Sequence, residues 1–241
     1  MAISSDKAAL AAGLVLSSTS DTLSNSGKFT LDPFLIRAKR LKRSVLNAAN
    51  LIQEELDGKG YKCAMLTLTY APEHDYSPKH ITRLLKCIRA YLARLGHPFC
   101  YVWVLENTKK GRPHYHVLVW LPKGVTLPKP DKQGWWAWGM TKVEWIRANG
   151  AAYIAKYCSK DGQQGEFPKV ARLHGCGGLS SSDRWRRSWW NLPAYVREEF
   201  PQADFQVSRA AGGGWISRLT GECLDSCFRV ESFSPLVVVR L

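Results

Sequence analysis

Apolar residues recur along the chain in two different periods, and these periods separate the expected helices from the expected strands. Between residues 33 and 56 they recur at spacings of three and four, which predicts a helix. A second helix is expected to begin at Ser77-Pro78, because serine suits the N-cap and proline the first turn, and to end at Gly96. A third helix is expected over residues 150–160, where Asp161-Gly162 closes the pattern.

Alternating positions that are rich in β-branched and aromatic residues predict four strands. These strands cover residues 63–70, 99–106, 113–121 and 140–145. Only the short segment Asn107–Arg112 separates the second strand from the third, so these two are expected to form a β-hairpin. Beyond Gly165 the chain is richer in glycine, tryptophan and arginine, and its pattern predicts no defined elements.

The same pattern divides the chain into three parts. Residues 1–30 are mostly small and polar, and their short apolar run lacks the basic flank of a leader peptide, so a flexible tail is expected. Residues 31–165 are the expected folded domain, and residues 166–241 form a basic extension that is rich in tryptophan and glycine. The length of 241 residues fits one large domain with appendages.

Composition and charge narrow the class of partner. A hydrophobic fraction of 45% is sufficient for a sizeable core, which excludes wholesale disorder. The 34 Lys and Arg residues exceed the 20 Asp and Glu residues, and the net charge of +14 favours a polyanionic partner. No stretch has the roughly 18 apolar residues of a membrane helix, so nucleic acid is expected rather than a membrane. Seven cysteines without a disulfide spacing indicate a reducing cytoplasm.

The expected hairpin carries a candidate metal site. His114 and His116 stand two apart in a strand, so their side chains project from the same face, roughly 6–7 Å apart. If paired residue numbers across the hairpin sum to 220, Glu106 lies opposite His114 and its carboxylate joins them. Two imidazoles and a carboxylate fit Mg²⁺, Mn²⁺ or another divalent ion that acts on a phosphate. The alternative is a pair of partly exposed strand histidines that bind nothing.

Two overlapping Tyr-x-x-Lys units lie in the third expected helix. Tyr153 and Tyr157 are one turn apart, so both lie on one face with their Cβ atoms about 5–6 Å apart. Lys156 is within reach of Tyr153, and Lys160 is within reach of Tyr157. A phenol with an ordinary pKa of about 10 is a poor nucleophile at neutral pH and needs a nearby cation or a polarised phosphate. The alternative is an amphipathic helix with half-buried tyrosines and solvated lysines.

Taken together, these motifs resemble those of the HUH replication-initiation endonucleases, the nicking enzymes of rolling-circle plasmids and single-stranded DNA phages. The resemblance covers roughly residues 60–165. Leu66–Tyr70 is similar to the family's first strand motif, Pro113–His116 to its His-hydrophobe-His motif, and Tyr153–Lys160 to the two-tyrosine motif of phage-type initiators. Glu106 stands where the third metal ligand of the family usually falls.

The resemblance implies an α+β fold, the HUH endonuclease fold, in which helices pack on a central antiparallel sheet of ferredoxin-like or RRM-like type. It implies that residues 31–165 form the nicking domain, with the metal ligands and the tyrosine helix facing each other. Tyr157 is implied to attack a scissile phosphate, which leaves a 5′-phosphotyrosyl link and a free 3′-OH. Tyr153 is implied to act in the second, closing cycle, and Lys156 and Lys160 to assist the tyrosines.

The implied function is site-specific nicking and rejoining of DNA, which initiates and terminates rolling-circle replication of a single-stranded DNA phage or a plasmid in a bacterial cytoplasm. The implied partners are single-stranded DNA, double-stranded origin DNA, and the host helicase and DNA polymerase. A host helicase is expected because the chain has no G-x-x-x-x-G-K-[ST] motif.

Basic residues outside these motifs supply the expected DNA contacts. One set lies in the hairpin turn beside the candidate metal ligands, where it can touch phosphates: Lys109, Lys110 and Arg112. A second set stands next to a Trp-Trp pair, in the manner of a stacking surface for single strands: Arg184, Arg186 and Arg187. For Trp189 and Trp190 the alternative is a tryptophan-rich core segment with solvated arginines.

Two other functions remain open at this point. A relaxase or a single-strand transposase would use related chemistry, but relaxases usually carry a three-histidine site and an N-terminal tyrosine, and the order here is opposite. A non-catalytic module that binds an origin would keep the positive charge without needing the tyrosines.

Overall fold

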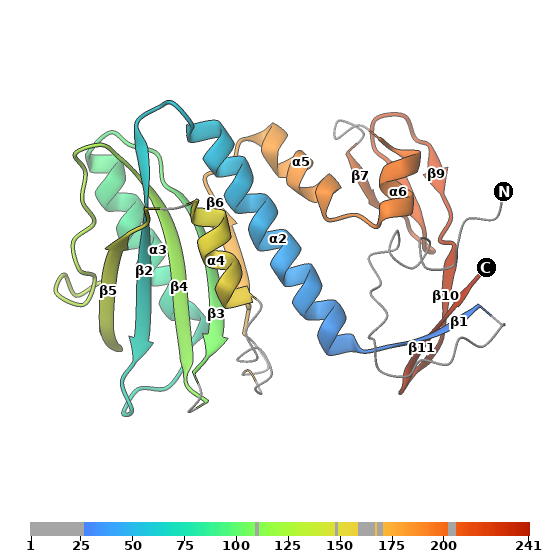
Figure 1. Cartoon of the computed structure of the whole chain (residues 1–241), viewed down its shortest axis with the longest axis horizontal. Coiled ribbons are helices and arrows are strands. Elements are labelled where there is room, and N and C mark those ends of the chain that lie inside the picture. Colours follow the sequence, from blue (N-terminus) through green and yellow to red (C-terminus); the bar gives the residue numbers. More distant parts are fainter. Residues whose placement is uncertain (1–26, 109–110, 148, 159–166, 168–170, 202–205) are drawn as a thin grey trace. The chain divides into compact units, whose positions relative to one another are not determined.

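The computed structural model describes residues 27–108, 111–147, 149–158, 167, 171–201 and 206–241 (Figure 1). The chain divides into two compact units. The first unit consists of residues 41–180, and the second consists of residues 1–40 together with residues 181–241. Among the described residues, no helix has the length and apolar character needed to cross a membrane.

The unit of residues 41–180 is built around a five-stranded sheet in the order β5-β2-β4-β3-β6. Each neighbouring pair in this sheet is antiparallel, with β4 at the centre and β5 and β6 at the edges. The strands are β2 (Tyr61–Tyr70), β3 (Cys100–Asn107), β4 (Pro113–Pro122), β5 (Gly139–Trp145) and β6 (His174–Gly177). An antiparallel sheet with packed helices confirms the predicted α+β fold.

Helices cover both faces of this sheet (Figure 1). Helix α3 (Pro78–Arg94) packs on one face, while α4 (Gly150–Cys158) and the part of α2 (Pro33–Leu56) from Leu41 onward pack on the other. Strand β4 serves both layers because its residues alternate. Its odd-numbered residues from Tyr115 to Leu121 join the core under α3, and Leu118 and Trp120 join the core under α2 and α4.

The elements expected between residues 33 and 158 are all present, with ends that differ by a few residues at most. At the start of α3 the side-chain oxygen of Ser77 accepts a hydrogen bond from the backbone N–H of Lys79 at 3.3 Å, and Pro78 occupies the first turn. This arrangement confirms the predicted N-cap. The last two residues of the third expected helix, 159 and 160, lie outside the described residues.

The first unit extends past the boundary expected at residue 165. Strand β6 pairs with β3 and completes the sheet, so the division falls at Ser180. The sequence His-Gly-Cys-Gly has no β-branched residue and predicts no strand. A Cβ on Gly175 would lie 2.6 Å from Nε1 of Trp103, and one on Gly177 would lie 2.5 Å from the ring of Tyr101. Aromatic rings of β3 therefore occupy the space above these glycines, and packing makes the strand.

The second unit contains elements that the sequence pattern does not predict. Its strands form two three-stranded sheets, β1-β11-β10 and β7-β8-β9. The strands are β1 (Lys28–Leu31), β7 (Val207–Arg209), β8 (Trp215–Ser217), β9 (Cys223–Leu224), β10 (Phe228–Phe233) and β11 (Leu236–Arg240). The helices are α5 (Ser181–Trp190) and α6 (Ala194–Glu199). Strand β1 includes the last residues of the expected tail, and residues 1–26 lie outside the described residues.

A small core stabilises the second unit. Val196 of α6 and Phe200, which follows that helix, pack with Val207 of β7 and Trp215 of β8. Trp189 packs against this cluster and donates its indole N–H to the carbonyl oxygen of Phe200 at 2.6 Å. Buried aromatic side chains thus replace the long apolar periodicity on which sequence-based prediction depends.

Gly139 permits the close pairing of β5 with β2, and its replacement tests this part of the fold. A Cβ at Gly139 would overlap the carbonyl oxygen of Thr69, and the residue has a φ of 150°. Gly139→Ala is therefore expected to lower the free energy of unfolding by about 2–4 kcal/mol in urea denaturation. Gly134→Ala is the matched control, with a φ of 70° but no atom within 4 Å of its Cβ, and should cost about 1 kcal/mol. Equal losses would contradict the overlap.

Candidate metal and tyrosine site

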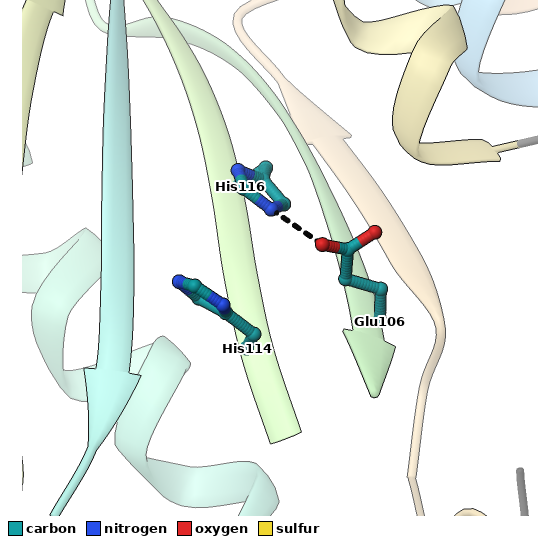
Figure 2. Close-up of side chains that lie close together, drawn as sticks. All are labelled: Glu106, His114 and His116. Carbon is teal, nitrogen blue, oxygen red and sulfur yellow. Dashed lines mark hydrogen bonds and ion pairs between the residues drawn. The ribbon is translucent and has the colours of Figure 1, made fainter. Parts of the chain in front are cut away.

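The register of the β3–β4 hairpin brings three candidate ligands together. Glu106 lies directly opposite His114, as the predicted register requires. Glu106, His114 and His116 each offer a ligand atom, and these atoms all lie within 4.8 Å of one another (Figure 2). Glu106 and His116 are buried, with 8% and 4% of their surfaces exposed, whereas His114 is half-buried. The sequence prediction that these three side chains share one face is confirmed.

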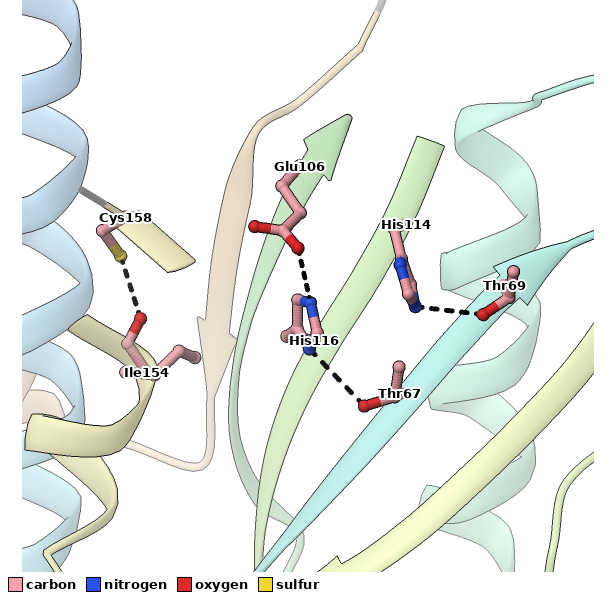
Figure 3. Close-up of polar contacts among 7 residues, drawn as sticks. All are labelled: Thr67, Thr69, Glu106, His114, His116, Ile154 and Cys158. Carbon is pink, nitrogen blue, oxygen red and sulfur yellow. Dashed lines mark hydrogen bonds and ion pairs between the residues drawn. The ribbon is translucent and has the colours of Figure 1, made fainter. Parts of the chain in front are cut away.

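Neighbouring side chains orient the two imidazoles (Figure 3). Nε2 of His116 lies 2.9 Å from Oε1 of Glu106, and its Nδ1 lies 3.5 Å from the hydroxyl of Thr67. Nε2 of His114 lies 3.0 Å from the hydroxyl of Thr69. These threonines stand opposite the two histidines in the β2–β4 pair. Sequence analysis assigned Thr67 and Thr69 no separate role, although both lie within the strand motif that carries the resemblance.

The donor set fits a divalent cation. The second carboxylate oxygen of Glu106, Oε2, is buried and has no hydrogen-bond partner among the described residues. A buried carboxylate oxygen without a partner is costly, because it loses its contacts with water. A cation beside Glu106 would satisfy that oxygen, and imidazole and carboxylate together are ligands that Mn²⁺ and related ions accept. The ligand chemistry does not select one ion.

Helix α4 places an aromatic side chain directly on this cluster. The ring of Tyr157 stacks on the ring of His116, with centroids 3.6 Å apart and planes inclined by 21°. Tyr153 lies one turn earlier, and its ring centroid is 5.9 Å from that of Tyr157. Nζ of Lys156 lies 4.9 Å from the centroid of the Tyr153 ring. The structure therefore brings both tyrosines and one lysine to the histidine face, while Lys160 lies outside the described residues.

Electrostatics around Tyr157 keep its phenol protonated in the absence of a nearby cation. Burial is the largest cause that raises its pKa above the ordinary value, and a hydrogen bond with Tyr153 adds to it. The carboxylates of Glu106 and Glu144 raise the pKa further, because their negative charge opposes a phenolate. Use of this phenol as a nucleophile therefore requires positive charge close by.

Close packing sets the position of α4 on the sheet. The side chain of Asn149 accepts a hydrogen bond from the backbone N–H of Ala151 at 2.8 Å, which caps the first turn. Gly150 is buried, and a Cβ there would lie 2.9 Å from Sγ of Cys63 on β2. At the other end, Sγ of Cys158 donates to the carbonyl oxygen of Ile154 at 3.5 Å (Figure 3). Burial raises the pKa of both thiols to about 12, so both remain uncharged.

The predicted DNA-contacting residues fall into different settings. Arg112 is exposed at the hairpin turn, two residues before His114, whereas Lys109 and Lys110 lie outside the described residues. The other three are on α5: Arg184, Arg186 and Arg187. Arg186 forms an ion pair of 3.0 Å with the buried Asp183, and Arg184 donates to the hydroxyl of Ser181 at 3.0 Å.

The Trp-Trp pair of α5 divides between two interpretations. Trp189 belongs to the core side of the second unit, through its hydrogen bond to the carbonyl of Phe200. Trp190 is 44% exposed, and its ring centroid lies 5.4 Å from the guanidinium carbon of Arg197. The core interpretation thus holds for Trp189, and Trp190 keeps a surface on which a base could stack.

Comparisons with known proteins agree with the motifs. Residues 63–162 match a family model for replication-associated proteins of the ORF2 type. The replication-associated protein ORF2 of Spiroplasma virus 4 is 29% identical over 120 residues, which cover 39% of this chain and 37% of that protein. No solved structure gives a significant match.

These matches support a phage rolling-circle replication initiator as the class that this chain resembles, and a role in DNA replication follows from them. The matched residues contain the candidate metal ligands and both tyrosines. The match spans little more than a third of the length of the curated relative, so the substrates and partners of the whole protein are matters for proposal.

The carboxylate of Glu106 provides a test of the metal site. Glu106→Gln keeps the shape of the side chain but removes its charge, so the affinity for Mn²⁺ should fall by at least about tenfold in a calorimetric titration. Glu144→Gln is the matched control, because this carboxylate lies on β5 and is exposed. Unchanged affinity in the Glu106 variant would remove it from the ligand set.

The contact between Gly150 and Cys63 provides a second test. Gly150→Ala should push the start of α4 away from β2 and weaken the stacking of Tyr157 on His116. The expected result is a loss of about 1–3 kcal/mol in unfolding free energy and a changed ring-current shift of the His116 imidazole. Adding Cys63→Ala removes the obstructing sulfur and should restore part of both signals. Additive losses in the double variant would show that the two side chains do not meet.

Proposed function

We propose that this protein nicks and rejoins DNA by tyrosine transesterification, and thereby initiates and terminates rolling-circle replication of a single-stranded DNA phage or a plasmid. The observation that carries the proposal is the 3.6 Å stacking of Tyr157 on His116. It joins the candidate nucleophile to the candidate ligand set, although the two lie on separate elements of the chain. The family match is a second, independent support.

In this proposal His114, His116 and Glu106 hold Mg²⁺ or Mn²⁺. The bound cation would supply a Lewis acid that polarises the scissile phosphate and stabilises its developing charge. Thr67 and Thr69 keep the imidazoles in a fixed orientation through their hydroxyl groups. The protein's own part is thus to present three ligands, already oriented, to one phosphate.

Tyr157 acts as the nucleophile. Its phenolic oxygen loses a proton and bonds to phosphorus, the P–O3′ bond breaks, and the departing 3′ oxygen takes up a proton. The products are a 5′-phosphotyrosyl link and a free 3′-OH that can prime synthesis. The energy of the phosphodiester bond is retained in the link, so rejoining requires no nucleoside triphosphate.

Tyr153 acts in the closing cycle, and its place one turn from Tyr157 supports this role. Lys156 beside the Tyr153 ring supplies positive charge near its phenol, and Lys160 is proposed to do the same for Tyr157. Arg112 and its neighbours in the turn, Lys109 and Lys110, would hold phosphates of the DNA next to the ligands. Origin recognition, the host helicase and the host polymerase complete the proposed cycle.

Replacement of the tyrosines tests the chemistry. Single-stranded oligonucleotides labelled at both ends and covering the origin are incubated with Mn²⁺ or Mg²⁺ and separated on denaturing SDS gels. The protein should retain the 3′ fragment as an adduct that EDTA prevents. Tyr157→Phe should lower the first cleavage by at least about a thousandfold, because no other group replaces the nucleophile. Tyr153→Phe should spare it, and Tyr61→Phe is the matched control for an unrelated tyrosine.

The ligands are tested in the same assay. His114→Ala should abolish metal-dependent nicking while salt-sensitive DNA binding stays largely intact, because binding depends on the basic surface. If neither tyrosine variant nor His114→Ala changes how the DNA is handled, and no adduct forms despite tight binding, the protein is a non-catalytic origin-binding module. An adduct that joins one DNA end to an unrelated strand would instead favour a transposase-like activity.

A further inference from the structure

A cavity of about 500 Å³ lies on the opposite face of the sheet from the histidines. It is bounded by α3 and by β3, β4 and β6, so it lies wholly within the unit of residues 41–180. Tyr115 lines it from β4, and the residues before and after Tyr115 are the two candidate metal ligands. Alternation of side chains along β4 places the cavity and the metal site on opposite sides of one strand. The proposed nicking chemistry makes no use of this cavity.

Aromatic side chains form the walls of the cavity. Trp103 and Tyr115 meet edge to face, with ring centroids 5.5 Å apart. The hydroxyl of Tyr115 donates to that of Tyr76 at 3.2 Å, and the two rings are inclined by 24°. Gly175 of β6 leaves room for the Trp103 ring, because a Cβ there would collide with the indole. Rings that are held in fixed orientation around an opening suit a flat aromatic ligand.

Three cations surround the same cavity. Lys86 and Arg89 come from α3, three residues apart on one helix face, and Arg172 precedes β6. All three side chains are exposed, and no acidic residue is among those described as lining the cavity. Burial raises the pKa of Tyr101, whereas Arg89, which hydrogen-bonds to the hydroxyl, and Arg172 lower it. Both guanidinium groups therefore lie close to the polar edge of the cavity wall.

We propose that this cavity binds one nucleotide, with its base against Trp103 and Tyr115 and its phosphate among Lys86, Arg89 and Arg172. An aromatic wall with a cationic rim is the combination that holds single-stranded nucleic acid. A volume of about 500 Å³ lies within the range of small-molecule sites and limits occupancy to a unit of this size. The choice of a nucleotide rests on the replication role, but not on DNA cleavage.

The nucleotide can come from two sources, a base turned out of a single strand or a free nucleotide. The test follows the indole N–H resonance of Trp103 in ¹⁵N-labelled protein, assigned with Trp103→Phe, in the presence of EDTA. Thymidine monophosphate, a dT hexamer, a hexamer with abasic sugars and inorganic phosphate are titrated separately. We expect the monophosphate and the dT hexamer to shift the resonance saturably, and the hexamer to bind more tightly because it also contacts the basic surface.

Variants of the rim connect the shift to the cavity. Arg89→Ala should weaken binding of the monophosphate at least fivefold, and Thr82→Trp should block the opening without changing the charge. Arg94→Ala removes one exposed arginine from the same helix outside the cavity and should leave binding unchanged. Tyr157→Phe should also bind normally, which separates this site from the proposed nicking.

The outcomes decide between the alternatives. A shift with the monophosphate but none with the hexamer would support the nucleotide site and identify free nucleotide as its source. A shift of equal size with phosphate alone or with the abasic hexamer would overturn the proposal, because the base would then contribute nothing. Absence of any shift of Trp103 in a protein that still forms the phosphotyrosyl adduct would overturn the cavity as a nucleotide site and leave the nicking proposal intact.

Discussion

Glu106 lies opposite His114, and the candidate site depends on this register of the β3–β4 hairpin. Side chains in a strand alternate between faces, so a slip of one residue in β4 would turn both imidazoles toward α3 and bring Tyr115 to the carboxylate. The apolar set on the α3 side opposes such a slip, because it would have to leave the core together with Tyr115. Burial of the sheet on both faces thus holds the polar cluster in place.

Helix α4 is the second part of this arrangement, and small residues set its distance from the sheet. Gly150 allows its first turn to approach Cys63, and the remaining length of the helix carries Tyr157 onto His116. Stacking of the two rings buries the phenol and raises its pKa, so packing and chemistry oppose each other at this residue. The positive charge that the site needs is the physical link between the histidine cluster and the tyrosine helix.

Much of the first unit and the core of its site could be predicted from the sequence. Long apolar periodicities marked α2, α3 and the strands, and the hairpin arithmetic placed Glu106 with the histidines. Other parts left no such signal. Strand β6 is made by rings of β3 packing on Gly175 and Gly177, which only the folded sheet reveals. In the second unit, short elements and contacts such as that of Trp189 with Phe200 replace periodic patterns.

The two edges of the central sheet have a consequence for how the protein behaves at high concentration. An exposed strand edge presents unpaired backbone groups to which another chain can add, and the usual outcome is aggregation. Strand β5 carries the exposed, paired charges of Lys142 and Glu144 along one edge. Strand β6 has only four residues, two of them glycines with no side chain to grip a partner. Neither edge offers a long apolar ladder, so the sheet ends at both sides without a template for growth into fibres.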